Sequence, residues 1–151
     1  MGEIRESGRI MKRIIGLCGI SHTGKATTLK LLLKFFDPTF MSSSRRNFRK
    51  ALTFKGGKIC IATCGDNPND LEENCSFFQQ EDFDIAITPT RSKGKSCERL
   101  ARMAREESTR IQWIEKKKDY LNPDSCNYEQ AVMLHDLIVN LIDNAEVNHV
   151  N

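Results

Sequence analysis

The chain has 151 residues, of which 39% are hydrophobic and 28% are charged, and its formal net charge is +3. This length suits one domain that buries its own core without metals or disulfides, and the composition is that of an ordinary globular protein. The small net charge does not indicate binding to nucleic acid, and no stretch approaches the roughly 18 apolar residues of a membrane span.

The cysteines indicate a reducing compartment. The chain has six of them, scattered without a C-x-x-C pair, and its N-terminus has no apolar secretory segment. This pattern predicts reduced, mostly buried thiols in a cytoplasmic protein. The three histidines stand apart, so no zinc cluster is expected. Residues 1–11 are polar and aperiodic, which predicts a flexible extension ahead of a single domain over 12–151.

The first predicted elements are a strand over 13–18 and a helix over 25–36. The strand is almost continuously apolar, which is typical of a parallel strand buried on both faces. In the helix, Leu29, Leu32, Leu33 and Phe36 recur at helical spacing, and Asp37-Pro38 ends the pattern.

The segment between this strand and this helix has the composition of a phosphate-binding loop. It begins at Gly19 and reaches a second glycine, Gly24, directly before Lys25. Glycines at both ends permit the backbone N–H groups to turn toward a polyphosphate. The start of the helix adds unpaired N–H groups and a partial positive charge, and the ammonium of Lys25 can reach the outer phosphates.

Gly19-Ile20-Ser21-His22-Thr23-Gly24-Lys25-Ala26-Thr27-Thr28 resembles the Walker A motif, G-x-x-x-x-G-K-[ST], of the P-loop NTPases. The resemblance implies a nucleoside triphosphate with Mg²⁺, ATP or GTP, as ligand. The residues expected to bind it are Gly19, His22, Thr23, Gly24, Lys25, Ala26 and Thr27. Ala26 departs from the motif, because the family has there a Ser or Thr whose hydroxyl holds Mg²⁺.

The remaining segments alternate between strands and helices. A hairpin is predicted over 51–63 around Gly56-Gly57, followed by a helix from Asn67-Pro68 and a strand over 83–88. Next come a basic loop over 89–95, a helix capped by Ser96, a strand over 110–114 and a last helix over 125–145 that frays after Glu146. The pattern predicts a three-layer α/β domain, like that of P-loop NTPases, with a mainly parallel five-stranded sheet.

Three groups of charged residues are candidates for catalysis. Asp66 follows the end of a predicted strand and can hold Mg²⁺ or orient water; alternatively, it simply starts the next helix. Arg91 directly follows another strand and can stabilise developing charge, unless that loop is merely solvated. Arg45, Arg46 and Arg49 can hold an acidic acceptor if the protein is a kinase.

Two family comparisons bear on the nucleotide. The hairpin resembles that of small GTPases, but their N/T-K-x-D motif has only Thr90-Arg91-Ser92-Lys93 as its nearest counterpart, which lacks the Asp. Guanine specificity is therefore unsupported, and ATP is favoured. We expect slow ATP hydrolysis with Lys25, Asp66 and Arg91 as catalytic residues. The alternatives are a nucleotide or small-molecule kinase, and a non-catalytic nucleotide-sensing or GTPase-like module that binds a protein partner.

Overall fold

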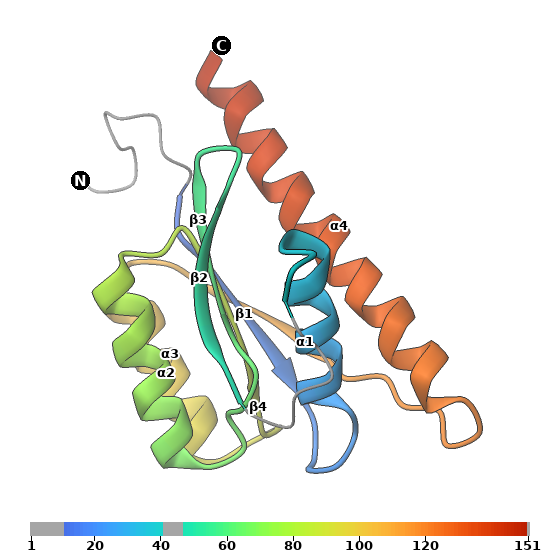
Figure 1. Ribbon diagram of the computed structural model, residues 1–151. Coiled ribbons are helices and arrows are strands. Elements are labelled where there is room, and N and C mark those ends of the chain that lie inside the picture. Colours follow the sequence, from blue (N-terminus) through green and yellow to red (C-terminus); the bar gives the residue numbers. More distant parts are fainter. Residues whose placement is uncertain (1–10, 41–46, 151) are drawn as a thin grey trace.

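The fold is known here from a computed structural model, which describes residues 11–40 and 47–150, with side chains through Asn144. The elements are β1 (Arg13–Cys18), α1 (Lys25–Phe36), β2 (Arg49–Phe54), β3 (Gly57–Ala62), α2 (Pro68–Glu81), β4 (Ile85–Thr90), α3 (Lys95–Glu106), β5 (Ile111–Glu115) and α4 (Pro123–Val150). The five strands form one sheet, seen in Figure 1 between the helices. Their order in the sheet is β2-β3-β4-β1-β5. Of the strand pairs described, β2–β3 is antiparallel and the others are parallel, so the predicted α/β class with a mainly parallel five-stranded sheet is confirmed.

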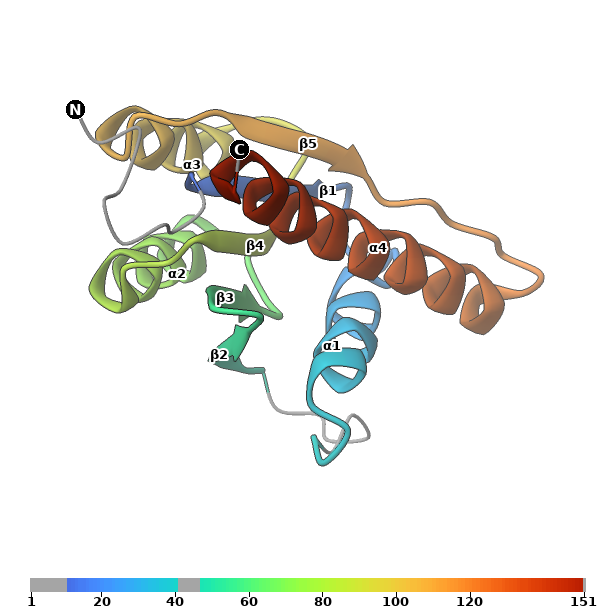
Figure 2. The same ribbon diagram turned by 90° about the horizontal axis from the view of Figure 1, so that it is seen from above.

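Helices cover both faces of the sheet. In β1, Ile15 and Leu17 pack with the apolar residues of α1 and α4, whereas Ile14 packs with those of α2 and α3. Figure 2 shows the same division, with α1 and α4 on one side of the strands and α2 and α3 on the other. Each face is buried because consecutive strand residues point to opposite sides. The chain therefore forms three layers, as predicted.

The sequence patterns located β1 and α1 at their observed bounds, but other boundaries differ. Strand β2 begins at Arg49, before the predicted hairpin. The prediction that Ser96 caps the third helix is wrong, because Gly94, with φ of 100°, is the N-cap and Ser96 is buried in the first turn. The last helix begins at Pro123, where a missing N–H costs nothing, and continues to Val150 instead of fraying after Glu146.

Strand β4 extends through a proline that was expected to end it. Pro89 pairs with Leu17 of β1, but the pairing of β4 with β3 stops at Ile87. The carbonyl of Thr90 accepts from Gly19 N on the β1 side, so the neighbouring Pro89 faces the β3 side, where no strand follows. The missing N–H of Pro89 therefore costs no hydrogen bond between strands. Strand β4 can continue to Thr90, which contacts Gly19 at the start of the glycine-bounded loop.

All six cysteines are free thiols, two of them buried and four partly buried. Burial raises the pKa of Cys60 to about 12 and that of Cys75 to about 11. These two thiols therefore stay protonated at neutral pH and behave as apolar core residues. No helix in the described part of the chain is both long enough and apolar enough to cross a membrane.

Candidate functional site

The glycine-bounded loop joins the carboxyl end of β1 to the first turn of α1. Its entry is fixed by Gly19 N, which donates to Thr90 O at 3.1 Å. Two residues have left-handed backbone conformations, His22 with φ of 64° and Gly24 with φ of 93°. The positive φ of Gly24 favours glycine there, and a Cβ would also lie 2.5 Å from Asn127 Oδ1, so the amide of Asn127 would have to turn aside.

The backbone N–H groups of residues 24–27 have no acceptor among the described residues, whereas Thr23 N closes a turn on Ile20. The first intrahelical bond of α1 is that of Thr28 N, which donates to Gly24 O at 2.9 Å. No described side chain caps α1, so its partial positive charge is also uncompensated. The loop thus presents a row of free donors at a helix N-terminus, which is an arrangement that binds anions.

Lys25 brings a positive charge to this row of donors. Its side chain is 4% exposed, and Nζ donates to Gly19 O at 2.5 Å, Asp66 Oδ1 at 2.5 Å and Thr90 O at 3.0 Å. These acceptors satisfy all three ammonium protons and hold the side chain across the loop. The structure therefore brings together Lys25 and Asp66, two of the predicted catalytic residues, although β4 separates their strands.

Asp66 reaches Lys25 because the turn after β3 packs tightly on the end of β4. A Cβ at Gly65 would lie 2.2 Å from Pro89 O, so only glycine permits this approach. The next helix is capped by Asn67, whose side chain accepts from Asp70 N at 2.8 Å. The alternative interpretation of Asp66 as the residue that starts α2 is therefore wrong, since Asn67 does this and Asp66 contacts Lys25.

A cleft of about 100 Å³ adjoins this ion pair. Ala26 lines it together with Lys25, Asp66 and Asp70, so two acidic residues share this cleft with the position where the Walker A motif has a hydroxyl. Within the described residues, no three His, Cys, Asp or Glu side chains form a metal-binding group. Mg²⁺ commonly binds to one or two carboxylates plus phosphate oxygens, and that donor set fits this cleft.

Two larger clefts lie on the other side of the loop and share Asn127. One, of about 290 Å³, is lined by His22 and Thr23 of the loop, by Tyr120 of the segment after β5 and by Pro123 at the start of α4. The other, of about 490 Å³, lies between Thr27 of α1 and Tyr128 of α4. Volumes of 300–1,000 Å³ are typical of small-molecule sites. A ligand anchored at the loop has room on this side for its non-phosphate part.

Arg91 lies at the same edge of the sheet but does not touch Lys25 or Asp66. It follows the last residue of β4, its side chain is exposed, and it has no ion pair with any described residue. Its carbonyl accepts from Cys97 Sγ at 2.9 Å, which fixes the backbone. The guanidinium is thus free to approach a ligand, and a catalytic role for Arg91 stays a prediction.

Arg45, Arg46 and Arg49 were predicted to hold an acidic acceptor, and the structure describes one of the three. Arg49 is part of β2, where Nε donates to Asn74 Oδ1 at 2.6 Å and Nη2 donates to Glu73 Oε1 at 2.9 Å. It therefore ties β2 to α2 and is not available to an acceptor as predicted. Arg45 and Arg46 lie outside the described residues.

Several residues of the site were not predicted. The role of the Thr90 carbonyl cannot be predicted from the sequence, because every residue type has a backbone carbonyl. Asn127 lies four residues before Ala131 on the apolar stripe of the last helix, and this spacing could have identified it. Asp66 precedes α2 and Asp70 lies in its first turn, so helical spacing does not relate the two. Tyr120 is 84% exposed in a segment without periodicity. Comparison with protein-family models and with curated proteins finds no match.

Proposed function

We propose that the protein is a P-loop nucleotide-binding protein that binds ATP and hydrolyses it slowly. The observation that carries this proposal is the row of unpaired N–H groups over residues 24–27, next to the buried ammonium of Lys25. Backbone donors and a lysine side chain lie at the same helix N-terminus, and this is the arrangement that a chain of phosphates needs. The six free thiols further support a cytoplasmic location.

Each residue of the site has a distinct role in this proposal. The N–H groups of the loop bind the inner phosphates, and Lys25 moves from its resting acceptors to the outer ones. Asp66, once released by Lys25, would hold Mg²⁺ or orient the attacking water, with Asp70 across the same cleft. Bound Mg²⁺ supplies charge neutralisation at the phosphate oxygens. Arg91 adds a mobile cation for the charge that develops on hydrolysis.

A non-catalytic nucleotide-sensing module is the second candidate function, and Ala26 is the observation that favours it. Its methyl group lines the cleft in place of the hydroxyl that would hold Mg²⁺. Nucleotide binding then persists without efficient hydrolysis, and a protein partner reads the bound state. A kinase is less supported, because Arg49 is already bonded to Glu73 and Asn74.

Thermal unfolding with ATP, GTP or ADP, each with Mg²⁺ and with EDTA, tests the proposal. ATP at 100 times its dissociation constant stabilises the folded state by about 2.7 kcal/mol. For a chain of this size we expect the unfolding temperature to rise by about 5–10 °C with Mg²⁺ and ATP. A shift that EDTA does not reduce would favour the sensing module, and no shift with any nucleotide would contradict both functions.

Ala26→Thr tests the assignment of the metal position. The added hydroxyl enters the cleft that contains Asp66 and supplies the Mg²⁺ ligand that the chain lacks there. We expect a larger difference in ATP affinity between Mg²⁺ and EDTA, and faster phosphate release. Ala26→Val is the matched control, because it has the same shape without the hydroxyl. Equal behaviour of the two variants would mean that the metal is held elsewhere.

A further inference from the structure

Strand β5 ends the sheet with an open edge. It pairs with β1, and no other described strand lies beside it. Ile114 O accepts from Cys18 Sγ and Lys116 N donates to Cys18 O, so the even-numbered residues turn their backbone groups toward β1. The backbone groups of Ile111 and Trp113 therefore face outward. The strand contains no proline, no lysine and no bulge, which commonly protect such edges.

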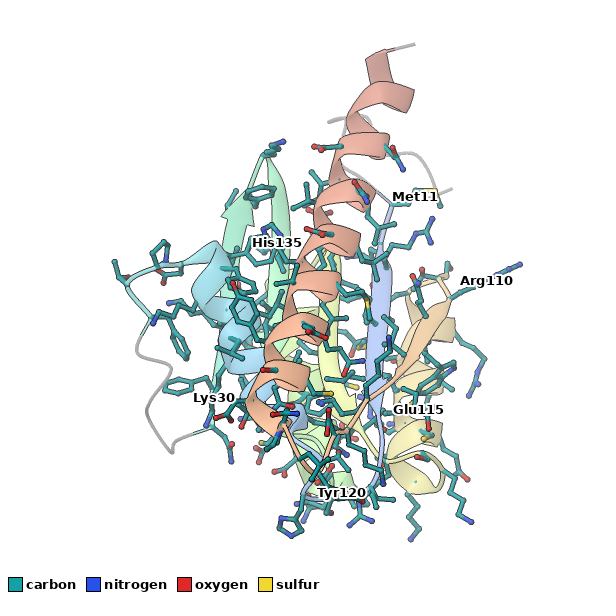
Figure 3. The ribbon with its side chains drawn as sticks, turned by 90° about the vertical axis from the view of Figure 1, so that its right-hand side faces the viewer. Met11, Lys30, Arg110, Glu115, Tyr120 and His135 are labelled. Carbon is teal, nitrogen blue, oxygen red and sulfur yellow. The ribbon has the colours of Figure 1, made fainter. Side chains whose placement is uncertain are left out.

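Apolar surface lies on both sides of this edge. On one side is a groove of about 620 Å³ between β5 and α4, lined by Gln112, Ile114, Glu129, Val132, Met133, Asp136, Leu137 and Asn140. On the other side lies Trp113, which is 45% exposed and packs over Gly16. Figure 3 shows α4 and β5 together on this face, with Arg110 and Glu115 at opposite ends of the strand.

We propose that a second copy of this chain binds here, with its own β5 antiparallel to the first. The two sheets then join into one, and the same surface serves on both copies, as in an isologous dimer. Outward N–H and C=O groups of Ile111 and Trp113 would pair between copies. The groove beside α4 would be covered at the same time.

Charge selects the register of this pairing. A twofold axis perpendicular to the sheet keeps every residue on its own face. One residue must therefore lie opposite its own copy across the axis, and near the middle of β5 that residue is Gln112 or Trp113. An axis at Trp113 would place the apolar Ile111 opposite the charged Glu115 of the second copy, which is an unfavourable cross-strand pair. An axis at Gln112 instead places Arg110 opposite Ile114, and Ile111 opposite Trp113. We therefore assign the axis to Gln112.

This register also gives Arg110 a partner. Arg110, Gln112 and Ile114 alternate onto the same face, so Arg110 of the second copy lies beside Ile114, in the groove that contains Glu129. Within the described residues, neither Arg110 nor Glu129 has an ion pair. The dimer would bring these two unpaired charges together twice, once on each side of the axis.

Charge reversal tests this interface. The wild-type chain is expected to elute in light-scattering chromatography with twice the mass of a single chain. Arg110→Glu and Glu129→Arg should each weaken the dimer by about tenfold or more, because each places like charges together. The double variant should restore it. Lys34→Glu, an exposed position on α1, is the matched control and should leave the dimer unchanged.

Trp113 provides a second measurement, since it is the chain's single tryptophan. Its emission should shift to shorter wavelength as the wild-type concentration rises, but not for Arg110→Glu. Unchanged circular dichroism would show that the variants fold. A monomeric wild type at all concentrations would overturn the proposal. A dimer that resists both single reversals, or that the double variant does not restore, would overturn this interface.

Discussion

Replacing Lys25 with alanine is expected to lower the affinity for ATP by at least about tenfold, since a charge-assisted phosphate contact contributes about 1.5–3 kcal/mol. The effect should be large because Nζ is buried and held directly across the loop by Gly19, Asp66 and Thr90. Among the described residues, no other lysine lines the cleft at Asp66. Isothermal titration with Mg²⁺ and ATP measures the affinity.

Two controls separate loss of binding from loss of fold. Lys34→Ala removes the same charge from an exposed position on α1 and should leave the ATP affinity unchanged. Lys25→Met keeps the apolar stem of the side chain, so its unfolding temperature without nucleotide should stay closer to the wild type than that of Lys25→Ala. If Lys25→Ala binds ATP as tightly as wild type, the site has been assigned to the wrong residues.

Gly65→Ala is expected to destabilise the fold by about 2–3 kcal/mol, which corresponds to a fall in the unfolding temperature of about 5–10 °C. The added Cβ would lie 2.2 Å from Pro89 O, 2.8 Å from Leu71 Cδ2 and 3.0 Å from Thr88 Oγ1. The first of these atoms belongs to the backbone of β4 and cannot turn away. The turn after β3 must therefore lift, and this moves Asp66 away from Lys25.

Gly57→Ala is the matched control for this variant. Its Cβ would meet Ile142 at 3.5 Å, an ordinary van der Waals distance, and its backbone is not left-handed. Alanine at such a position leaves the free energy of unfolding unchanged or raises it by about 0.5–1 kcal/mol. We therefore expect the two variants to differ clearly in thermal unfolding. Equal stability of the two would contradict the tight packing at Gly65.

The sequence predicted the parts of the fold that depend on local pattern. An apolar run gave β1, helical spacing gave α1, and paired glycines gave the hairpin of β2 and β3. Asp66 was a candidate because a carboxylate after a parallel strand lies at the ligand-binding edge of the sheet. The structure places Asp66 at this edge in contact with Lys25, and its role in binding or catalysis stays a prediction.

The features that the sequence missed depend on long-range pairing. No local pattern states that β4 lies between β1 and β3, or that β3 stops early enough to accommodate Pro89. Arg49 was assigned to a ligand because its partners on α2 are 24 and 25 residues away in the chain. Side-chain partners at such separations follow from topology, which periodicity does not encode.

An anion that enters the loop has to displace Asp66 or a carbonyl oxygen from Lys25 Nζ, because three acceptors already hold it. For orthophosphate this exchanges one contact of the ammonium for another of similar strength. If the loop binds phosphates as proposed, a longer polyphosphate also bonds to the free N–H groups along residues 24–27, and these added bonds offset the exchange. The resting position of Lys25 would then make the length of the phosphate chain a selectivity criterion, and we expect inorganic phosphate to compete poorly with ATP for the loop.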